Sequence, residues 1–561
     1  MREIECRASD WLFNAGLVGF INIVGKENVR MEGQSVFFDA DLLDSFEDKY
    51  FAYFIEEYEK TLSWYKIVSF KKEMDRYRKD DFASFDEKAL EELNNYIANV
   101  AKYYLKSASY VSVYPLIDAT ADPVEWGKNL AKVGALKKKE TFDEKRADII
   151  QEVKQVYLKL DQIIAFCNSE KGERYLAAKN VIYTVIKNAW NGVSFLNPQT
   201  KEKDTYVDYR TNFIDPVKEH LETNLEKAKF TCFTCNQPIK NLKLDLSFMN
   251  ETGFDTARKT SHVWDFNNDI AVCAVCKFIY SCVPAGFTYV HNNGIFINDS
   301  VSIDTLHAVN EKIRSAILHD PAQTLTHTSP YRALVEAITN QVEDKRHYEL
   351  ADIQVVRYEN ETYRFNILSK RALNIFRESK NALTALQRCG FKEGNVNVNF
   401  YQETVRRLMN NENLFTFIHK AMYLKVTNAS NTYYHMGHIG SLLEINTNFL
   451  KEIEAMTEIS KGRIWHINKC GNEFKKAYPD HKRSGFNYKV LNALKTNNRD
   501  AFMDIILNSY SYLGKTVPDF FLESFTSDET FKTVGYAFMV GVNGAIEQED
   551  KDKDGGNDNE K

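Results

Sequence analysis

The chain has 561 residues, of which 44% are hydrophobic and 27% are charged, with 10 prolines, 24 glycines and a formal net charge of −6. This composition is typical of a globular protein and excludes a fibrous or an intrinsically disordered chain. Because a single hydrophobic core stops growing at about 250 to 300 residues, the length predicts two to four domains.

The N-terminal segment carries no membrane or export signal that we recognise. The apolar run from Leu12 to Val24 is interrupted by Asn14 and Asn22, so it is too short and too polar to span a bilayer. The start MREIECRASDW lacks the basic flank, apolar stretch and cleavage site of a signal peptide. We therefore expect a cytoplasmic protein with no membrane partner.

The first elements predicted along the chain are a hairpin and an amphipathic helix. Residues 29–39 (VRMEGQSVFFD) alternate around Gly33 as the two strands of a hairpin do. The sequence from Ser84 to Glu87 is typical of a capping box at the start of a helix. The apolar residues that follow share one helical face and are expected to be core: Leu90, Leu93, Ile97, Val100 and Tyr104.

Four of the nine cysteines form two C-x2-C pairs, Cys232 with Cys235 and Cys273 with Cys276. Two such pairs can supply the four thiolates of a tetrahedral zinc site. A buried apolar cluster and redox chemistry are the alternatives, whereas a reducing cytosol disfavours a disulfide framework. Because four sulfur ligands leave no position for water, we expect a structural zinc and not a hydrolytic one.

The surroundings of the second pair support this prediction. Residues 287–297 predict two strands joined by an Asn-Gly turn, and metal knuckles commonly lie beside such hairpins. The 37-residue gap between the pairs should form a subdomain that includes Trp264 and Phe266. Cys282 is expected in the core. We assign no ligand role to the nearby histidines His262 and His291.

The C-terminal part of the sequence is dominated by helical periodicity. Residues 354–368 first predict a hairpin around Glu359 and Asn360. From Leu442 onward apolar residues recur at helical spacing, which predicts a helical bundle. Residues 547–561 carry seven acids against three lysines and no large apolar side chain, so we expect a solvated tail.

The fold class is therefore α+β and mainly helical. No convincing internal repeat is found in the sequence. We divide the chain into an N-terminal α+β domain (1–225), a zinc-binding subdomain (226–300), a remainder of the N-terminal or central domain (301–430), a C-terminal helical bundle (431–546) and an acidic tail (547–561).

The charge is unevenly distributed. Between Lys461 and Arg499, ten Lys or Arg stand against two acids, a local net of +8, so the rest of the chain sums to −14. Cations mixed with flat rings suit the backbone and bases of a single nucleic-acid strand. The alternative is a solvated lysine-rich helix face with buried aromatic side chains. The aromatic residues of this stretch are Trp465, Phe474, Tyr478, Phe486 and Tyr488.

The sequence shows none of the common signatures of catalysis. It contains no G-x-x-x-x-G-K-[ST] phosphate loop, no H-E-x-x-H zinc motif and no G-x-S-x-G elbow. No pair of carboxylates is marked as catalytic by its neighbours. Enzyme activity is therefore not the leading expectation.

Several motifs, taken in order, resemble the large subunit of type I-B CRISPR surveillance complexes (Cascade). Each motif is short, and their order and combination carry the resemblance over nearly the whole chain. Residues 300–430 match no motif of that family. The matching segments are 9–20 (SDWLFNAGLVGF), 190–196 (WNGVSFL), the two cysteine pairs, 487–494 (NYKVLNAL), 498–504 (NRDAFMD), Pro518 and 535–541 (GYAFMVG).

The resemblance implies a binding subunit without chemistry of its own. In that family the N-terminal domain, with its zinc site, docks near the 5′ handle of the crRNA and recognises the protospacer-adjacent motif (PAM) on duplex DNA. The C-terminal bundle helps to hold the displaced strand, and a separate helicase-nuclease is recruited to cut. The implied partners are crRNA, target double-stranded DNA, that nuclease, and the backbone, handle-binding and small subunits of Cascade.

Two details follow from the same resemblance. Relatives make a small subunit from an internal start codon, for which Met436 and Met456 are candidates here. A PAM-reading loop needs close backbone access and hydrogen-bonding side chains. The best candidate for such a loop is residues 190–195 (WNGVSF). In the alternative, Gly192 ends the preceding helix and Trp190 is buried. The candidate DNA contacts in this loop are Lys187, Asn191, Gly192 and Ser194.

For the displaced strand, the candidates are the cations Lys461, Arg463, Lys475, Lys476, Lys482, Arg483 and Lys489. Opening a duplex against a guide is a near-balanced exchange, so modest contacts of this kind can decide it. Two other classes of protein remain open. A metal-dependent nuclease or hydrolase would need an open metal position, and a zinc-stabilised interaction protein unrelated to CRISPR would purify without guide RNA.

Overall fold

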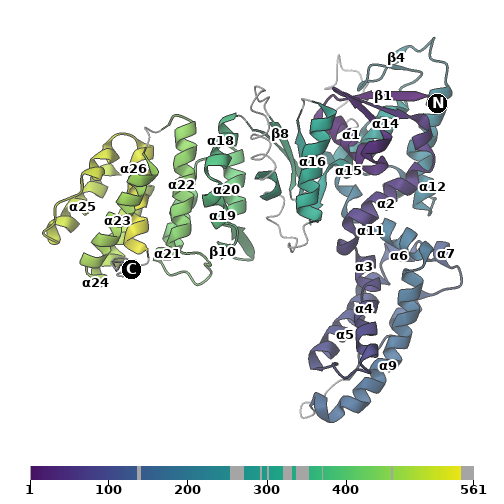
Figure 1. Cartoon of the computed structure of the whole chain (residues 1–561), viewed down its shortest axis with the longest axis horizontal. Coiled ribbons are helices and arrows are strands. Elements are labelled where there is room, and N and C mark those ends of the chain that lie inside the picture. The colour runs from purple at the N-terminus through teal and green to yellow at the C-terminus, as the bar shows by residue number, and fades with distance from the viewer. Residues whose placement is uncertain are drawn as a thin grey trace, which may run out of the picture. The chain divides into compact units, whose positions relative to one another are not determined.

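The computed structural model describes residues 2–134, 141–252, 271–290, 293–299, 302–319, 332–335, 353–359, 361–368, 370–455 and 459–544. The described chain is mainly helical with several small sheets, which confirms the predicted α+β class (Figure 1). None of the described helices combines the length and apolar character needed to cross a bilayer. Predictions at the following positions lie outside the described residues: His262, Trp264, Phe266, His291, Asn360, Met456 and the tail 547–561.

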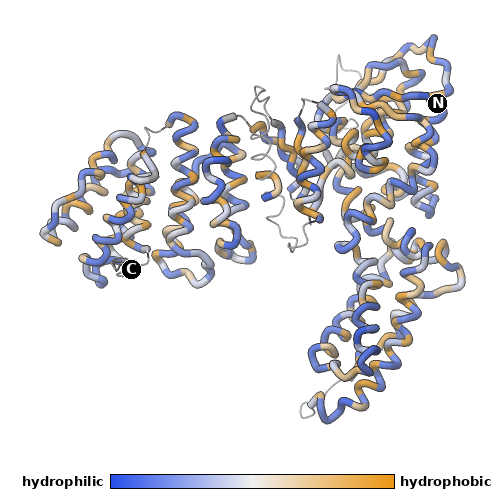
Figure 2. Tube along the Cα trace, viewed as in Figure 1, coloured by the Kyte–Doolittle hydropathy of each residue, from blue (hydrophilic) through white to orange (hydrophobic). Residues whose placement is uncertain are grey.

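The chain forms two compact units. Unit 1 consists of Met1–Leu325 with Val356–Phe365, and unit 2 consists of Thr326–Val355 with Asn366–Lys561. In both units hydrophilic and hydrophobic residues alternate along many of the helices, as the colouring of Figure 2 shows. Such alternation is expected of helices that are buried on one side.

The first part of unit 1 contains β1 (Glu3–Arg7), α1 (Trp11–Val24), β2 (Arg30–Glu32), β3 (Ser35–Asp39), α2 (Phe46–Tyr58), α3 (Ser63–Val68), α4 (Lys71–Lys79), α5 (Glu87–Asn99), α6 (Ala108–Val111), α7 (Tyr114–Ile117), α8 (Pro123–Lys128) and α9 (Phe142–Cys167). The second part contains α10 (Glu170–Gly172), α11 (Ala178–Thr184), η6 (Ile186–Asn188), η7 (Ser194–Leu196), α12 (Thr205–Tyr209), η8 (Arg210–Ile214), α13 (Asp215–Glu222), β4 (Phe230–Thr231), β5 (Pro238–Ile239), η9 (Ser247–Thr252), α14 (Ala274–Ser281), α15 (Val283–Gly286), β6 (Thr288–Val290), β7 (Asn293–Asn298) and α16 (Ile303–Leu318). The strands β8 (Ile353–Glu359) and β9 (Thr362–Leu368) follow, and they complete a four-stranded sheet of order β6-β7-β8-β9.

The predicted hairpins are present, with one change of register. β2 and β3 pair antiparallel around Gly33, and β1 joins the other side of β3. β6 and β7 also pair antiparallel, but Val290 pairs with Asn293 and Tyr289 pairs with Gly294. Asn293 and Gly294 therefore lie inside β7, and the predicted Asn-Gly turn is wrong. Gly294 is needed for another reason, because a Cβ atom there would lie 2.6 Å from the ring of Tyr289.

Helix α1 is buried almost throughout and packs closely on α14 and α15. Its N-cap is Asp10, whose carboxylate accepts a 2.8 Å hydrogen bond from the backbone N–H of Leu12. A Cβ atom at Gly16 would lie 2.5 Å from the carbonyl oxygen of Ile279, and one at Gly19 would lie 2.0 Å from that of Cys282. Only glycine permits this approach, so the N-terminal motif fixes the position of α14.

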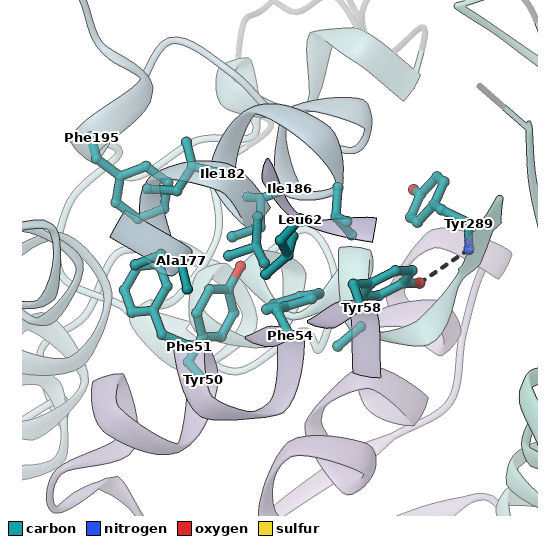
Figure 3. Packing of buried hydrophobic residues seen from close by; sticks show 14 of the residues in the cluster. Tyr50, Phe51, Phe54, Tyr58, Leu62, Ala177, Ile182, Ile186, Phe195 and Tyr289 are labelled. Atoms are coloured by element: carbon teal, nitrogen blue, oxygen red, sulfur yellow. Dashed lines mark hydrogen bonds between the residues drawn. The ribbon is translucent and has the colours of Figure 1, made fainter. Parts of the chain in front are cut away.

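The core of unit 1 is rich in aromatic side chains. Figure 3 shows Tyr50, Phe51, Phe54 and Tyr58 of α2 packed against the α11 region. The backbone N–H of Tyr289 donates to the Tyr58 hydroxyl at 3.1 Å, which ties the β6 strand to this helix. A core this dense holds α2, α11 and β6 in one unit.

Helix α5 begins two residues later than predicted. Its N-cap is Asp86, whose side chain accepts from the backbone N–H of Ala89 at 2.8 Å. Ser84 instead donates to Asp80, so the predicted capping box is wrong. The predicted apolar stripe is confirmed as core by its four buried members, Leu90, Leu93, Ile97 and Val100.

Unit 2 ends in the predicted helical bundle. Its central helix, α26, is buried from Thr530 to Val542 and packs on α23. A Cβ atom at Gly541 would lie 2.0 Å from the carbonyl oxygen of Asn468, so these two helices meet backbone to backbone. The described elements of unit 2 are α18 (Lys370–Glu378), α19 (Lys380–Ala385), β10 (Gly390–Glu393), β11 (Val396–Asn399), α20 (Phe400–Met409), α21 (Phe415–Val426), α22 (Met436–Glu452), α23 (Lys461–Ala477), α24 (Asp480–Lys495), α25 (Arg499–Tyr512), η12 (Asp519–Phe525) and α26 (Asp528–Asn543).

Candidate metal centre and nucleic-acid contacts

The first cysteine pair lies in a tight turn between β4 and β5. The backbone N–H of Cys232 donates to the carbonyl of Gln237 at 2.8 Å, and the N–H of Asn236 donates to the carbonyl of Cys232 at 2.9 Å. Asn236 has a φ of 58°, which Asn tolerates better than most residues. The turn therefore presents the side chains of Cys232 and Cys235 on the same side.

The second pair lies at the start of α14. Cys273 is the N-cap of this helix, and its Sγ accepts a 3.3 Å hydrogen bond from the backbone N–H of Cys276. The two pairs are joined directly, because the backbone N–H of Cys273 donates to Sγ of Cys232 at 3.2 Å. Backbone donors of this kind orient sulfur ligands in metal sites.

The four sulfur atoms form a single cluster. All four ligand atoms lie within 4.8 Å of one another, and Sγ of Cys235 is 3.8 Å from Sγ of Cys273. A tetrahedral site with metal–sulfur bonds of about 2.3 Å has sulfur atoms about 3.8 Å apart. Three of the cysteines are buried, and Cys235 is partly exposed. The cluster fits one metal ion, and the predicted pairing of the two motifs is confirmed.

The protonation of the cluster depends on its internal hydrogen bonds. Hydrogen bonds from Cys235, Cys273 and Cys276 hold the pKa of Cys232 far below its ordinary value. The hydrogen bond with Cys232 in turn raises the pKa of Cys273. The cluster alone thus lowers the pKa of Cys232 and Cys235 and raises the pKa of Cys273 and Cys276, whereas a divalent cation would stabilise all four thiolates.

Cys282 is fully buried, and its thiol donates to the carbonyl of Phe278 at 3.6 Å. Burial raises the pKa of this thiol, so it stays protonated in the core. The prediction that Cys282 is a core residue and not a ligand is confirmed.

Comparison with protein families identifies the segment that contains both cysteine pairs. Residues 226–288 match the family model described as CRISPR-associated protein (Cas_CXXC_CXXC). The match supports a CRISPR-associated protein. It covers the β4–β5 turn, α14 and the start of β6, so the region of the match is also the region of the sulfur cluster. The comparisons with curated proteins and with solved structures gave no significant match.

The predicted DNA-reading loop follows α11 and η6 in unit 1. Trp190 is completely buried, and its indole Nε1–H donates to the carbonyl of Ser281 at 3.1 Å. The backbone N–H of Asn191 donates to the carbonyl of Phe248 at 2.9 Å. Gly192 has a φ of 77° and is exposed. The burial of Trp190 was expected in the helix-cap alternative, but α11 already ends at Thr184, so Gly192 is not its cap.

The other two candidates of this loop differ in exposure. Lys187 lies in η6 with an exposed side chain. Ser194 is only 3% exposed, and its hydroxyl donates to Asp208 at 3.1 Å. Because this hydroxyl is buried and engaged, we remove Ser194 from the candidate DNA contacts. Lys187, Asn191 and Gly192 remain.

A hollow of about 430 Å³ lies beside this loop. Two charged residues line it, Lys277 of α14 and Asp245, and neither was singled out from the sequence. Lys277 directly follows Cys276, so its position depends on the same helix start that places the second cysteine pair. The remaining lining residues are Asn191, Gly192, Val193, Leu196, Pro198, Ser247 and Phe248.

Three of the cations predicted to bind the displaced strand are engaged inside unit 2. Arg463 donates from Nε to Glu523 at 2.8 Å, which links α23 to η12. Lys475 donates to the carbonyl of Gly544 at 2.6 Å, and burial lowers its pKa. Arg483 pairs with Asp480 on the same helix. These three side chains support the bundle itself.

Three other cations of this set face solvent. Lys476 and Lys489 are exposed and have no ion pair among the described residues. Lys482 is also exposed, and its ammonium lies 3.8 Å from the centre of the Tyr512 ring. For Lys461 only the backbone position, at the start of α23, is described. The available charge of this segment is therefore smaller than its composition suggests.

The aromatic residues of the segment divide in the same way. Phe474 and Phe486 are buried, with ring centroids 5.0 Å apart. Trp465 is 61% exposed and Tyr488 is 68% exposed. Lys469 lies 5.5 Å from the Trp465 ring, so a cation and an exposed ring occur together there. Trp465 and Tyr488 are the side chains that a base could stack on.

Proposed function

We propose that this protein is the non-catalytic large subunit of an RNA-guided type I-B CRISPR antiviral complex (Cascade). The observation that carries the proposal is the four-cysteine cluster within residues 226–288, the segment that matches a CRISPR-associated family model. The further motifs that resemble the large subunit, from residue 9 to residue 541, extend the same assignment along the chain.

In this proposal the cluster holds one structural zinc ion. Zinc prefers tetrahedral sulfur ligands, and a complete four-sulfur shell leaves no position for an activated water. The ion would stabilise the junction between the β4–β5 turn and α14. It would supply no step of a reaction, which agrees with a subunit that recruits a separate helicase-nuclease for cleavage.

The proposed contacts with DNA fall into two groups. In unit 1, Asn191 and Gly192 would approach the PAM, and Lys187 would contact a neighbouring phosphate. In unit 2, Lys476, Lys482 and Lys489 would neutralise phosphates of the displaced strand, while Trp465 and Tyr488 would stack on its bases. Because R-loop formation is near balance, contacts worth a few kcal/mol can decide whether a target stays open.

The partners that this function requires are crRNA, target double-stranded DNA, the other Cascade subunits and the recruited helicase-nuclease, all in the cytoplasm. The direct test is to express the tagged chain in its native host, purify it and identify bound RNA and proteins. We expect short RNAs with a common 5′ handle together with further Cascade subunits.

Two outcomes would overturn the proposal. Purification of the chain without RNA and without other CRISPR proteins would favour a zinc-stabilised interaction protein. Metal-dependent cleavage of DNA by the purified chain would favour the nuclease or hydrolase alternative. The same preparation can be analysed for zinc, so one experiment addresses both the assembly and the metal.

A further inference from the structure

The hollow beside the Asn191 loop is built from three segments that the metal region fixes in place. The loop is tied to Phe248 by the Asn191 N–H bond of 2.9 Å. Asp245 forms a β-bridge with Ala271, and the N–H of Val272 donates to the carbonyl of Leu244 at 2.9 Å. Ala271 and Val272 lead directly to Cys273, the first residue of the second cysteine pair. The shape of the hollow therefore depends on the metal knuckle.

The two charged groups of the hollow have opposite hydrogen-bonding roles. The ammonium of Lys277 has no ion pair or hydrogen bond with another described residue, and it lies 5.6 Å from the centre of the Phe213 ring and 5.9 Å from that of the Phe248 ring. Oδ1 of Asp245 accepts from the N–H of Ser247 at 3.1 Å and from its hydroxyl at 2.7 Å. Oδ2 accepts nothing from the described residues. The hollow thus offers one cationic donor and one oriented carboxylate acceptor.

The rest of the lining combines polar and apolar residues. Asn191 and Ser247 are polar, and the apolar residues are Val193, Leu196, Pro198 and Phe248. A volume of about 430 Å³ is within the range of small-molecule sites, which is about 300 to 1,000 Å³. At Gly192 a Cβ atom would meet nothing within 4 Å, so the backbone beside the hollow is open to a ligand.

We propose that this hollow binds a guanine base presented by a nucleic-acid strand. On its pairing edge guanine has an acceptor, O6, beside two donors, N1–H and the N2 amino group. Lys277 donates to O6, and the carboxylate of Asp245 accepts from the two donors. No other DNA base places one acceptor next to two donors on this edge, so the pair of side chains selects guanine.

The same groups disfavour the obvious alternatives. A phosphate in the hollow would lie beside the carboxylate of Asp245, which repels it. A free guanine nucleotide would need cations for its phosphates, and Lys277 is the only cation among the lining residues. A base held inside, with its backbone passing over Gly192, leaves the phosphates in solvent. The occupant that fits is therefore a base of a strand.

This inference rests on the proposed function, because it places one specific base contact in the region assigned to target recognition. The test uses the assembled complex and a target library that is randomised beside the segment complementary to the guide and carries abasic sites opposite the randomised positions, because the pairing edge of guanine is occupied by cytosine in a duplex. We expect guanine to be enriched at one position. Asp245→Asn and Lys277→Met should each reduce that enrichment by about 5- to 150-fold, the range for loss of a bidentate base contact.

Lys243→Met is the matched control, since Lys243 is an exposed lysine of the same segment that does not line the hollow. It should leave the enrichment unchanged. All variants are checked for zinc content and thermal stability, so that a loss of fold is separated from a loss of readout. A wild-type complex that retains no DNA contradicts the proposed function. If the complexes with Asp245→Asn and Lys277→Met still retain DNA with an unchanged preference for guanine, the guanine site is wrong and the proposed function still stands.

A second measurement identifies the strand. Single-stranded oligonucleotides with one 6-thioguanine, as DNA or as RNA, are irradiated with the complex, and the crosslinked peptides are mapped. Crosslinks to the peptides that contain Lys277 or Phe248, lost in Lys277→Met and not competed by dGMP at equal concentration, support a strand-borne base. Competition by dGMP at equal concentration would show a mononucleotide site and overturn the assignment.

Discussion

The sulfur cluster of unit 1 and the basic segment of unit 2, residues 461–499, use their side chains in opposite ways. All four cysteines of the cluster converge within 4.8 Å. The cations of the basic segment divide between internal contacts, as at Arg463, and solvent, as at Lys476. A tetrahedral metal site requires every ligand at once, whereas each charge on a helix face can be used separately. Spacing is therefore strong information about a metal site, and net charge is weak information about a binding surface.

The largest effect should come from breaking the cluster. Cys273→Ser removes one sulfur ligand but leaves a residue that can still cap α14, and structural zinc contributes about 10 to 16 kcal/mol of apparent binding energy in small peptides. We expect loss of bound zinc and local unfolding, measured by elemental analysis and limited proteolysis. Cys470→Ser makes the same chemical change in α23 of unit 2, at a cysteine outside the cluster, and should keep the metal. Full zinc content in Cys273→Ser would contradict the assigned ligand set.

A smaller effect is expected where the bundle packs backbone to backbone. Gly541→Ala places a Cβ atom 2.0 Å from the Asn468 carbonyl oxygen, so α23 and α26 must separate. Overpacking of this kind costs about 1 to 3 kcal/mol, which denaturant unfolding can measure. Gly485→Ala in α24 meets no atom within 4 Å and should instead stabilise the helix by up to about 1 kcal/mol. Equal effects of the two changes would contradict close packing at Gly541.

Replacing the exposed cations of the basic segment should have the smallest effect on stability. It tests whether these cations, and not the internally engaged ones, bind DNA. Each phosphate contact to a single strand contributes about −0.7 to the slope of log K against log salt. Replacing Lys476, Lys482 and Lys489 by Ala should flatten the slope for target DNA by about 2, with an unchanged melting temperature. Replacing Arg463, Lys475 and Arg483 by Ala should instead lower the melting temperature, because these side chains make contacts inside the bundle. If only the change at Arg463, Lys475 and Arg483 altered the salt slope, the assignment of Lys476, Lys482 and Lys489 as the DNA contacts would be wrong.

The sequence predicted the fold class and the convergence of the cysteine pairs because both depend on local spacing. The C-x2-C spacing forces a turn or a helix start, and either brings two sulfur atoms together. Positions decided by competition between neighbouring residues were harder to predict. At α5, Asp86 and not Ser84 caps the helix, since both are good N-caps and only the packing of the first turn selects between them.

Contacts between residues that lie apart in the sequence could not be predicted from it. Ser194 carried a suitable hydroxyl, but Asp208 fourteen residues later engages it in the interior. Lys277 and Asp245 are separated by a segment of the chain that includes most of the gap between the cysteine pairs, so no periodicity joins them. The only signal in the sequence was that Lys277 directly follows Cys276 of the second cysteine pair, which fixes its direction on α14.

The close packing of α1 on α14 and α15 has a consequence for biosynthesis. Asn22 of α1 donates to the carbonyl of Ala285, a residue 263 positions later in the chain. At a synthesis rate of about 5 to 20 residues per second, the apolar α1 leaves the ribosome roughly 10 to 50 s before its packing partner exists. During that interval its apolar surface lacks this packing partner, so we expect it to bind chaperones. Translation speed and chaperone supply, more than final stability, should therefore set the yield of folded protein.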